Sequence, residues 1–163
     1  MEIINHSALN VTSDYTKEVH TGESKLVNQN GFLFYTYEGV HYLMGYVGTQ
    51  TALTLPADYN GEAYTVYQYA FYRNTSITSI VVPEGVKEIG SHAFKACTSL
   101  VSIELPHSLQ KIDDLILLEC SALMMIKFNG TSEEWKILDK GYEWDYLTGE
   151  YSIVCTDKIL SKS

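Results

Sequence analysis

A strict sequence period runs through the middle of the chain and constrains its fold more than any other feature. Phe71 is followed by Phe94 at an interval of 23 (94 − 71), and Leu117 follows Phe94 at the same interval (117 − 94). Residues 71–93 and 94–116 are identical at seven of 23 aligned positions, and the matches fall on apolar and turn residues. A period of this length is typical of a repeat protein in which each copy forms one coil of a solenoid.

The repeat also sets two columns of apolar residues. The first column is Leu53, Ile80, Ile103 and Ile126, and the second is Leu55, Val82, Leu105 and Phe128. The two columns are two positions apart, so both point to the same side of a β-strand. Stacked copies therefore predict short parallel strands with an apolar inner wall. Pro83 and Pro106 are expected to end two strands, since proline cannot donate to the ladder. Phe71 and Phe94 are expected to fill the back of the coil.

The first and last copies depart from the period. The interval from Leu53 to Ile80 is 27 (80 − 53), so this coil carries about four extra residues (27 − 23), which we place around the Asn60-Gly61 turn. In the last copy, residues 113–117 replace the Gly and Ala-Phe of the middle copy, which predicts an irregular back wall there. The result is a minimal solenoid of about three copies, near the lower limit for stability.

Both ends of such a solenoid require caps. Two β-rich runs, 32–37 and 40–47, flank Glu38-Gly39 and predict a hairpin over the first coil. Thr131 with Glu134 three positions later predicts a capping box. It would start a short amphipathic helix that reaches about Asp139 and carries Trp135, Ile137 and Leu138. A final strand is expected around residues 151–155. The chain is thus divided into a linker-like segment (1–24), an N-terminal β cap (25–52), repeats (53–128) and a C-terminal cap (129–163).

The middle copy resembles a known repeat family. The run Ile89-Gly90-Ser91-His92-Ala93-Phe94-Lys95-Ala96-Cys97-Thr98-Ser99-Leu100, followed by Leu105-Pro106, is similar to the BspA-like, or treponemal-type, leucine-rich repeat. The resemblance covers about residues 30–155. It implies an α/β leucine-rich-repeat right-handed solenoid, β-rich with stacked short parallel strands, an N-terminal β-hairpin cap and a C-terminal helix-plus-strand cap.

The same resemblance implies a function and a location. Members of this kind are surface or secreted proteins of host-associated microbes, which use their repeats for adhesion or protein recognition. Residues 2–11 look like the linker between modules of longer members, so the chain is expected to be the last module of a larger protein. The N-terminus lacks a basic region followed by an apolar run, so it is not a signal peptide. The residues alone leave two alternatives, a cytoplasmic protein or a mature or trimmed piece of a longer one.

Charge and hydropathy exclude several classes of partner. The chain has 20 acidic and 11 basic residues and a net charge of −9. This balance argues against nucleic acid, whose affinity comes from Lys and Arg on phosphates, and against an anionic membrane surface. No run approaches the roughly 18 apolar residues of a membrane helix, so we expect no membrane insertion.

No pattern of catalytic or metal-binding residues stands out. No two of the five histidines have the i, i+4 spacing of a helical metal site. Cys97 and Cys120 share one repeat position, which indicates packing on the inner wall as reduced thiols, and neither they nor Cys155 have zinc spacing. Asp113-Asp114 is not followed by the further oxygen ligands that calcium needs. We therefore predict a protein that is not an enzyme and has no cofactor and no metal.

Two kinds of surface remain as candidates for binding. The outward positions of the predicted strands are Ser79, Val81, Ser102, Glu104, Met125 and Lys127. Aromatic residues cluster in the first coil and in the C-terminal cap, and the candidates among them are Tyr67, Tyr69 and Trp144. The strand positions favour a non-enzymatic protein-interaction or adhesion module whose partner is an unknown protein, with a host extracellular protein as the candidate. The aromatic residues favour instead a carbohydrate-binding or enzyme-associated accessory module with a glycan partner, unless they only cover the coil ends and the back wall.

Overall fold

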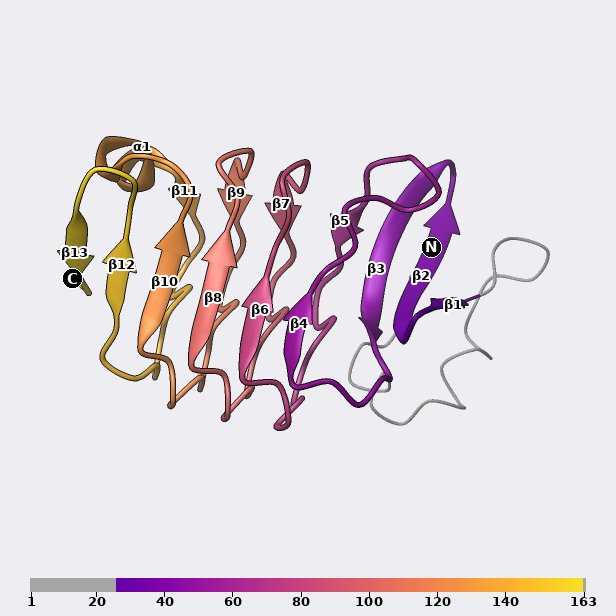
Figure 1. The fold of residues 1–163 in the computed structure, drawn as a ribbon, viewed down its shortest axis with the longest axis horizontal. Coiled ribbons are helices and arrows are strands. Elements are labelled where there is room, and N and C mark those ends of the chain that lie inside the picture. Colours follow the sequence, from indigo (N-terminus) through magenta and orange to yellow (C-terminus); the bar gives the residue numbers. More distant parts are fainter. Residues whose placement is uncertain (1–25, 163) are drawn as a thin grey trace.

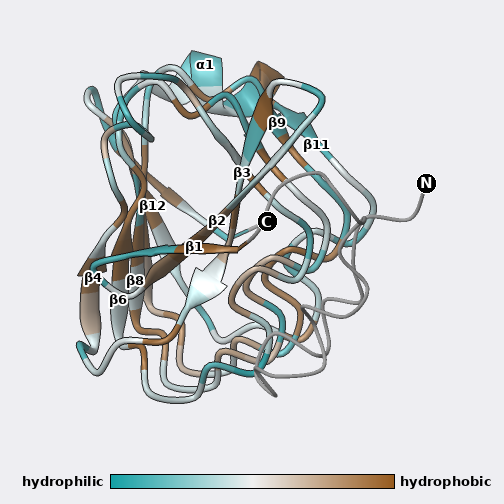
Figure 2. Cartoon of the chain, turned by 90° about the vertical axis from the view of Figure 1, so that its right-hand side faces the viewer, coloured by the Kyte–Doolittle hydropathy of each residue, from teal (hydrophilic) through white to brown (hydrophobic). Residues whose placement is uncertain are grey.

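Stacked coils give the molecule its shape in the computed structural model, which describes residues 26–162 (Figure 1). The linker-like segment predicted for residues 1–24 lies outside them. Each coil up to residue 149 contributes one strand to each of two sheets and then a back turn, whereas residues 152–161 add two strands to one sheet. Seen along the coil axis, hydrophobic residues follow the strands and the back turns, while the loops beside the helix are hydrophilic (Figure 2).

The six-stranded sheet contains the predicted apolar columns. Its strands, in chain order, are β4 (Ala52–Thr54), β6 (Ser79–Val81), β8 (Ser102–Leu105), β10 (Met125–Phe128), β12 (Ser152–Val154) and β13 (Ile159–Ser161). The strands β4, β6, β8, β10 and β12 are joined by parallel pairing, and β13 closes the sheet antiparallel to β12. The solenoid therefore has about five turns, and the three copies expected from the sequence were too few.

The register of these strands confirms both columns. Leu53 pairs with Ile80, Ile80 with Ile103, and Ile103 with Ile126. None of the eight column residues is more than 2% exposed. β8 ends at Leu105, directly before Pro106, and β6 ends before Pro83, as predicted.

The seven-stranded sheet combines the hairpin cap with the second strand of each coil. Its strands are β1 (Val27–Gln29), β2 (Phe32–Tyr37), β3 (Val40–Tyr46), β5 (Thr65–Val66), β7 (Glu88–Ile89), β9 (Lys111–Ile112) and β11 (Asp139–Lys140). The antiparallel hairpin β2–β3 turns at Glu38 and Gly39, which both have positive φ, and β3 continues into the parallel strands through β5. The predicted N-terminal hairpin cap is thus confirmed.

The back turns are more regular than the sequence indicates. Phe71 and Phe94 fill them as predicted, with ring centroids 5.4 Å apart. The irregular back wall expected at residues 113–117 is wrong, because Leu115 (φ 55°) has the left-handed conformation of His92 (φ 58°). Hydrogen bonds to the neighbouring coils impose this conformation, and Ile116 and Leu117, each 1% exposed, take the places of the Ala and Phe in the core.

The C-terminal cap differs from its prediction in several details. The helix α1 (Ser132–Ile137) has the predicted capping box between Thr131 and Glu134, but it does not reach Asp139. Leu138 leaves helical geometry (ψ 129°), and Asp139 pairs instead with Lys111 in the seven-stranded sheet. Ile137 is 82% exposed, so it is not part of the apolar face of the helix. The strand β13, which follows the expected strand β12, has no counterpart in the prediction.

Candidate binding surface

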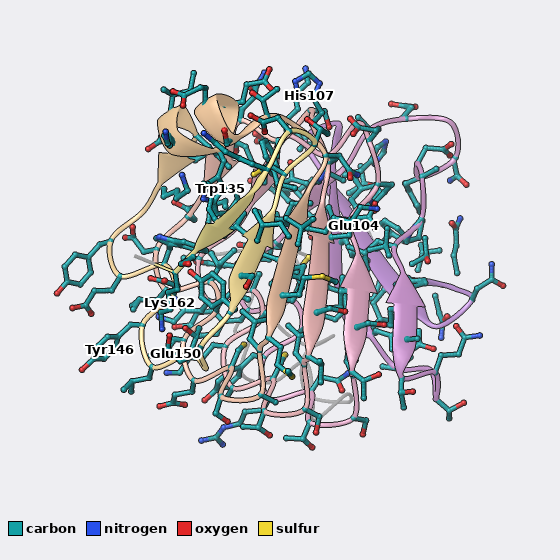
Figure 3. The ribbon with its side chains drawn as sticks, turned by 60° about the vertical axis from the view of Figure 1, so that its left-hand side comes forward. Glu104, His107, Trp135, Tyr146, Glu150 and Lys162 are labelled. Atoms are coloured by element: carbon teal, nitrogen blue, oxygen red, sulfur yellow. The ribbon has the colours of Figure 1, made fainter. Side chains whose placement is uncertain are left out.

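The six predicted strand residues lie together on the outward face of the six-stranded sheet. One row is Ser79, Ser102 and Met125, and the other is Val81, Glu104 and Lys127, as the strand register requires. Ala52 and Ser152 extend the first row, and Thr54 and Val154 extend the second. The side chains are half-buried or exposed, and in Figure 3 Glu104 lies over the strands of this sheet. The first row is made mostly of small residues, so the surface that it offers has few protruding side chains.

Charges on this face are neutralised locally. Lys127 Nζ lies 3.3 Å from Glu104 Oε2, and Asn129 Nδ2 donates a hydrogen bond of 2.9 Å to Glu104 Oε1. Val81 and Val154 flank this ion pair in the same row. The arrangement leaves a nearly neutral surface on a chain whose net charge is −9.

Three exposed apolar side chains that the sequence did not single out, Val101, Met124 and Ile159, enlarge the patch around Met125. Met125 in β10 is 38% exposed, and Val101 and Met124, which directly precede β8 and β10, are 40% and 66% exposed. Ile159 in β13 is 67% exposed and pairs with Val154. Val101 and Met124 occupy the same position in successive copies (124 − 101 = 23), so the repeat indicates that they align but not that they are exposed.

The three aromatic candidates lie elsewhere and apart from one another. Trp144 is partly buried and packs against the core between Trp135 and Tyr151, with ring centroids 5.7 and 6.3 Å away. Tyr69 lies in a back turn and stacks on His92 with centroids 4.5 Å apart. Of the three, Tyr67 lines a groove.

That groove runs across the seven-stranded sheet. Tyr67 and Tyr42 meet edge to face at 5.2 Å in its wall. Polar groups complete the lining, namely Gln68, Glu88, Ser91 and Asp113. Asp113 is partly neutralised by Lys111, whose Nζ lies 3.1 Å away. Aromatic rings beside amide, hydroxyl and carboxylate groups can contact a sugar through both its faces and its hydroxyls.

The surroundings of the three thiols disfavour their thiolate forms. Burial raises the pKa of Cys97 well above its usual value and that of Cys120 to about 12. Burial also raises the pKa of Cys155. A reactive cysteine needs the opposite shift, because the thiolate is the nucleophile. All three cysteines are free and buried, and Cys97 and Cys120 pack in the core as predicted.

Three polar residues, Thr36, His41 and Glu62, are connected in the order hydroxyl, imidazole, carboxylate that is found in hydrolytic triads. His41 Nδ1 lies 2.7 Å from Thr36 Oγ1, and its Nε2 lies 3.3 Å from Glu62 Oε2. Thr36 and His41 are a cross-strand pair of the hairpin, and the His41 ring packs on Tyr59. The adjacent pocket is lined by His41 and Glu62 but not by Thr36. We therefore interpret the contacts among these three residues as structural, because they connect the hairpin to the first coil. Among residues 26–162, no three His, Cys, Asp or Glu side chains are grouped so as to hold a metal ion.

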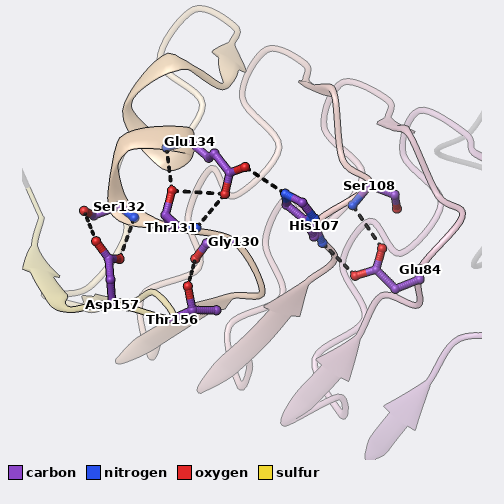
Figure 4. A network of polar contacts seen from close by, with 9 residues as sticks. All are labelled: Glu84, His107, Ser108, Gly130, Thr131, Ser132, Glu134, Thr156 and Asp157. Carbon is purple, nitrogen blue, oxygen red and sulfur yellow. Dashed lines mark hydrogen bonds and ion pairs between the residues drawn. The ribbon is translucent and has the colours of Figure 1, made fainter.

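A polar network links the loops of three coils beside α1 (Figure 4). Glu134 accepts a hydrogen bond of 2.8 Å from the Thr131 N–H and lies 2.9 Å from His107 Nε2. Glu84 accepts hydrogen bonds from the N–H groups of His107 (2.8 Å) and Ser108 (3.0 Å). The Thr131 N–H and His107 lower the pKa of Glu134 to about 2, and Glu134 raises the pKa of His107.

We expect this network to stabilise the C-terminal cap most between pH 4.5 and pH 6.5, the ordinary pKa values of its Glu and His. The contribution of His107 is complete below pH 6.5 and disappears as the pH rises through its raised pKa. The contribution of Glu134 is complete above pH 4.5 and is lost as the pH falls towards 2. Amide exchange at Trp135, corrected for intrinsic rates, should therefore be slower at pH 5.5 than at pH 8. His107→Gln should abolish the difference, and a difference that survives this change would contradict the assignment.

The fold and part of the sequence are similar to proteins already known. A family model described as BspA type leucine rich repeat region (6 copies) matches residues 62–137. A leucine-rich repeat protein of Treponema pallidum is 28% identical with a TM-score of 0.57, over 65% of this chain and 54% of its own. One from Bacteroides capillosus is 27% identical with a TM-score of 0.55, over 72% of this chain and 96% of its own. This chain thus spans about half of the Treponema protein.

A third solved structure is similar to this chain in its fold but has low sequence identity. The leucine rich cell surface protein of Faecalibacterium prausnitzii is 17% identical with a TM-score of 0.53, over 85% of this chain and 44% of its own. No curated protein matches the chain. Within residues 26–162, no helix has the length and hydropathy needed to cross a membrane.

Proposed function

Residues 62–137 are BspA-type leucine-rich repeats, and from this premise we propose that the chain is a non-enzymatic protein-interaction module whose partner binds the outward face of the six-stranded sheet. Solenoids offer extended surfaces for such contacts, and the repeat family is associated with protein interaction. The observation that carries the proposal is the nearly neutral, partly apolar patch around Met125 and the Glu104–Lys127 ion pair. Patches of this composition on a charged protein are typical of contact surfaces.

We further propose that the module works in adhesion as part of a bacterial cell-surface or secreted protein, with a host extracellular protein as its partner. The support is the association of BspA-type repeats with surface proteins and the description of the Faecalibacterium structure as a cell surface protein. The acidic balance of the chain, −9 overall, favours a protein over nucleic acid as the partner.

Glycan binding is the second candidate, and the groove beside Tyr67 favours it. Tyr42 and Tyr67 supply the rings, and Gln68 and Glu88 supply polar groups in the same lining. Trp144 lies outside this groove and is partly buried against the core.

One set of binding measurements separates the two candidates. The chain is tested by biosensor against purified extracellular-matrix and plasma proteins and on a glycan array. Met125→Glu should weaken protein binding at least about tenfold, which is about 1.4 kcal/mol, because it places a charge in the apolar patch. Tyr67→Ala is the matched control on the other sheet and should leave protein binding unchanged.

Two results would contradict the proposal or redirect it. Protein binding that is insensitive to Met125→Glu would exclude this face as the contact. Glycan binding that is lost in Tyr67→Ala would favour the groove instead. Thermal melts of both variants should match the parent chain, since a shared loss of folding would remove binding for an unrelated reason.

A further inference from the structure

The back turns of successive coils are joined by a regular ladder. In each turn, three alternate N–H groups donate to three carbonyl groups of the next turn. In the first tier Tyr69, Phe71 and Arg73 donate to Ser91, Ala93 and Lys95, at 3.0, 2.7 and 2.9 Å. In the second tier His92, Phe94 and Ala96 donate to Asp114, Ile116 and Leu118, at 3.1, 3.0 and 2.8 Å. In the third tier Leu115, Leu117 and Glu119 donate to Tyr142, Trp144 and Tyr146, at 3.1, 2.9 and 3.2 Å.

The ladder is open at its C-terminal end. Glu143, Asp145 and Leu147 occupy the donor positions of the last turn, and within residues 26–162 no group accepts a hydrogen bond from their N–H groups. Elsewhere in the last coil, β13 covers β12 in the six-stranded sheet, β11 is the edge strand of the seven-stranded sheet, and α1 lies at the opposite end of the coil from the back turn (Figure 1).

The open turn already has the conformation of a paired one. Glu143 (φ 44°) and Leu147 (φ 54°) are left-handed, like Leu115 (φ 55°) and Glu119 (φ 65°) in the turn before. Residues other than glycine rarely adopt this region. A further segment could therefore pair with the turn without first rearranging its backbone, which lowers the entropic cost of binding.

Apolar side chains surround this open edge. Tyr142, Tyr146 and Leu147 are 68%, 49% and 55% exposed. In Figure 3, Tyr146 points away from the ribbon at the end of the molecule. Exposed tyrosines are frequent anchors of protein contacts, because a large rigid ring is buried at low entropic cost.

The charge around the edge selects the partner. Glu119, Glu143 and Glu150 are exposed here. The nearby cation, Lys162, is held by hydrogen bonds to Thr148, at 2.8 Å from its Oγ1. A second copy of the chain would bring a net charge of −9 and would be repelled. A cationic segment would be attracted.

We propose that the back turn at residues 142–147 is a docking edge for an extended, cationic segment of another protein. The segment supplies carbonyl groups to the three open N–H groups and so adds one more tier to the ladder. Its cationic side chains face Glu143 and Glu150. This edge is separate from the outward face of the six-stranded sheet, and the inference does not rest on the function proposed for that face.

The test uses a capped octapeptide of alternating arginine and threonine as the probe, titrated into the ¹⁵N-labelled chain. We expect saturable binding in which the amide resonances of Glu143, Asp145 and Leu147 shift and their hydrogen exchange slows at least about tenfold. The double variant Glu143→Lys/Glu150→Lys should weaken binding at least about tenfold. Its matched control, Glu38→Lys/Glu88→Lys, removes two exposed glutamates elsewhere and should have little effect.

Other outcomes would overturn the proposal. Shifts spread equally over all acidic surfaces, or equal losses in both double variants, would mean unspecific attraction between charges. Binding without slowed exchange at the three amides would exclude the added tier. Self-association that is lost in Tyr146→Ser but kept in Tyr72→Ser, the equivalent position of the first coil, would identify a second copy as the occupant.

Discussion

Replacement of Ile103 by alanine is expected to lower the free energy of unfolding by about 2–5 kcal/mol. Ile103 lies in β8, the middle strand of the five parallel ones, and is 1% exposed. It pairs with Ile80 on one side and Ile126 on the other. Its removal leaves a cavity between two coils that cannot collapse without breaking the register of both.

Urea unfolding, followed by circular dichroism and by tryptophan fluorescence, measures this effect. Ser102→Ala is the matched control, because Ser102 lies next to Ile103 but on the outward face. Its effect should stay within about 0.5 kcal/mol, as for most surface changes. Equal effects of the two substitutions would mean that the strand register is wrong.

Trp135→Ala is expected to destabilise the C-terminal end of the solenoid by about 3–5 kcal/mol. Trp135 is 5% exposed and contacts the rings of Phe128 and Trp144, with centroids 5.4 and 5.7 Å away. Lys140 Nζ lies 4.5 Å from its ring centroid, and burial lowers the pKa of this amine. The tryptophan thus holds the helix, the last coil and the end of the inner wall together.

Hydrogen exchange shows which strands lose protection in Trp135→Ala. Stability in a solenoid is nearly a sum over neighbouring coils, so protection should fall first in β11 and β12 and least in β5 and β7. Ile137→Ala, in the same helix but 82% exposed, is the control and should change little. Uniform loss of protection along the chain would show instead that the coils unfold as one unit.

The sequence predicted the positions of the candidate surface residues best where the period is strict. Ser79, Ser102 and Met125 share one row of the sheet because each directly precedes a column residue. The period says nothing of how far a side chain is covered, so the exposure of Met124 and Ile159 came only from the structure. Trp144 illustrates the same limit, since its packing between Trp135 and Tyr151 is visible only in the structure.

The last back turn escaped the sequence for a related reason. Leu115 and Glu143 are equivalent in the ladder, yet the interval between them is 28 (143 − 115) instead of the usual 23, because α1 is inserted between them. A search for the 23-residue period does not find a copy whose spacing differs. The hydrogen bonds from Leu115 to Tyr142 and from Leu117 to Trp144 restore the stacking in space.

The sequence by itself determined the repeat, both apolar columns, the hairpin and the capping box of Thr131 and Glu134, because these depend on residue spacing and local chemistry. Only the tertiary structure decided the conformation of the back turns and the number of coils. A left-handed Leu115 or Leu147 is not favoured by its own side chain. The backbone conformation of such residues is set by the hydrogen bonds between one coil and the next. These hydrogen bonds form only when the coils stack, so a single copy of the repeat does not determine them.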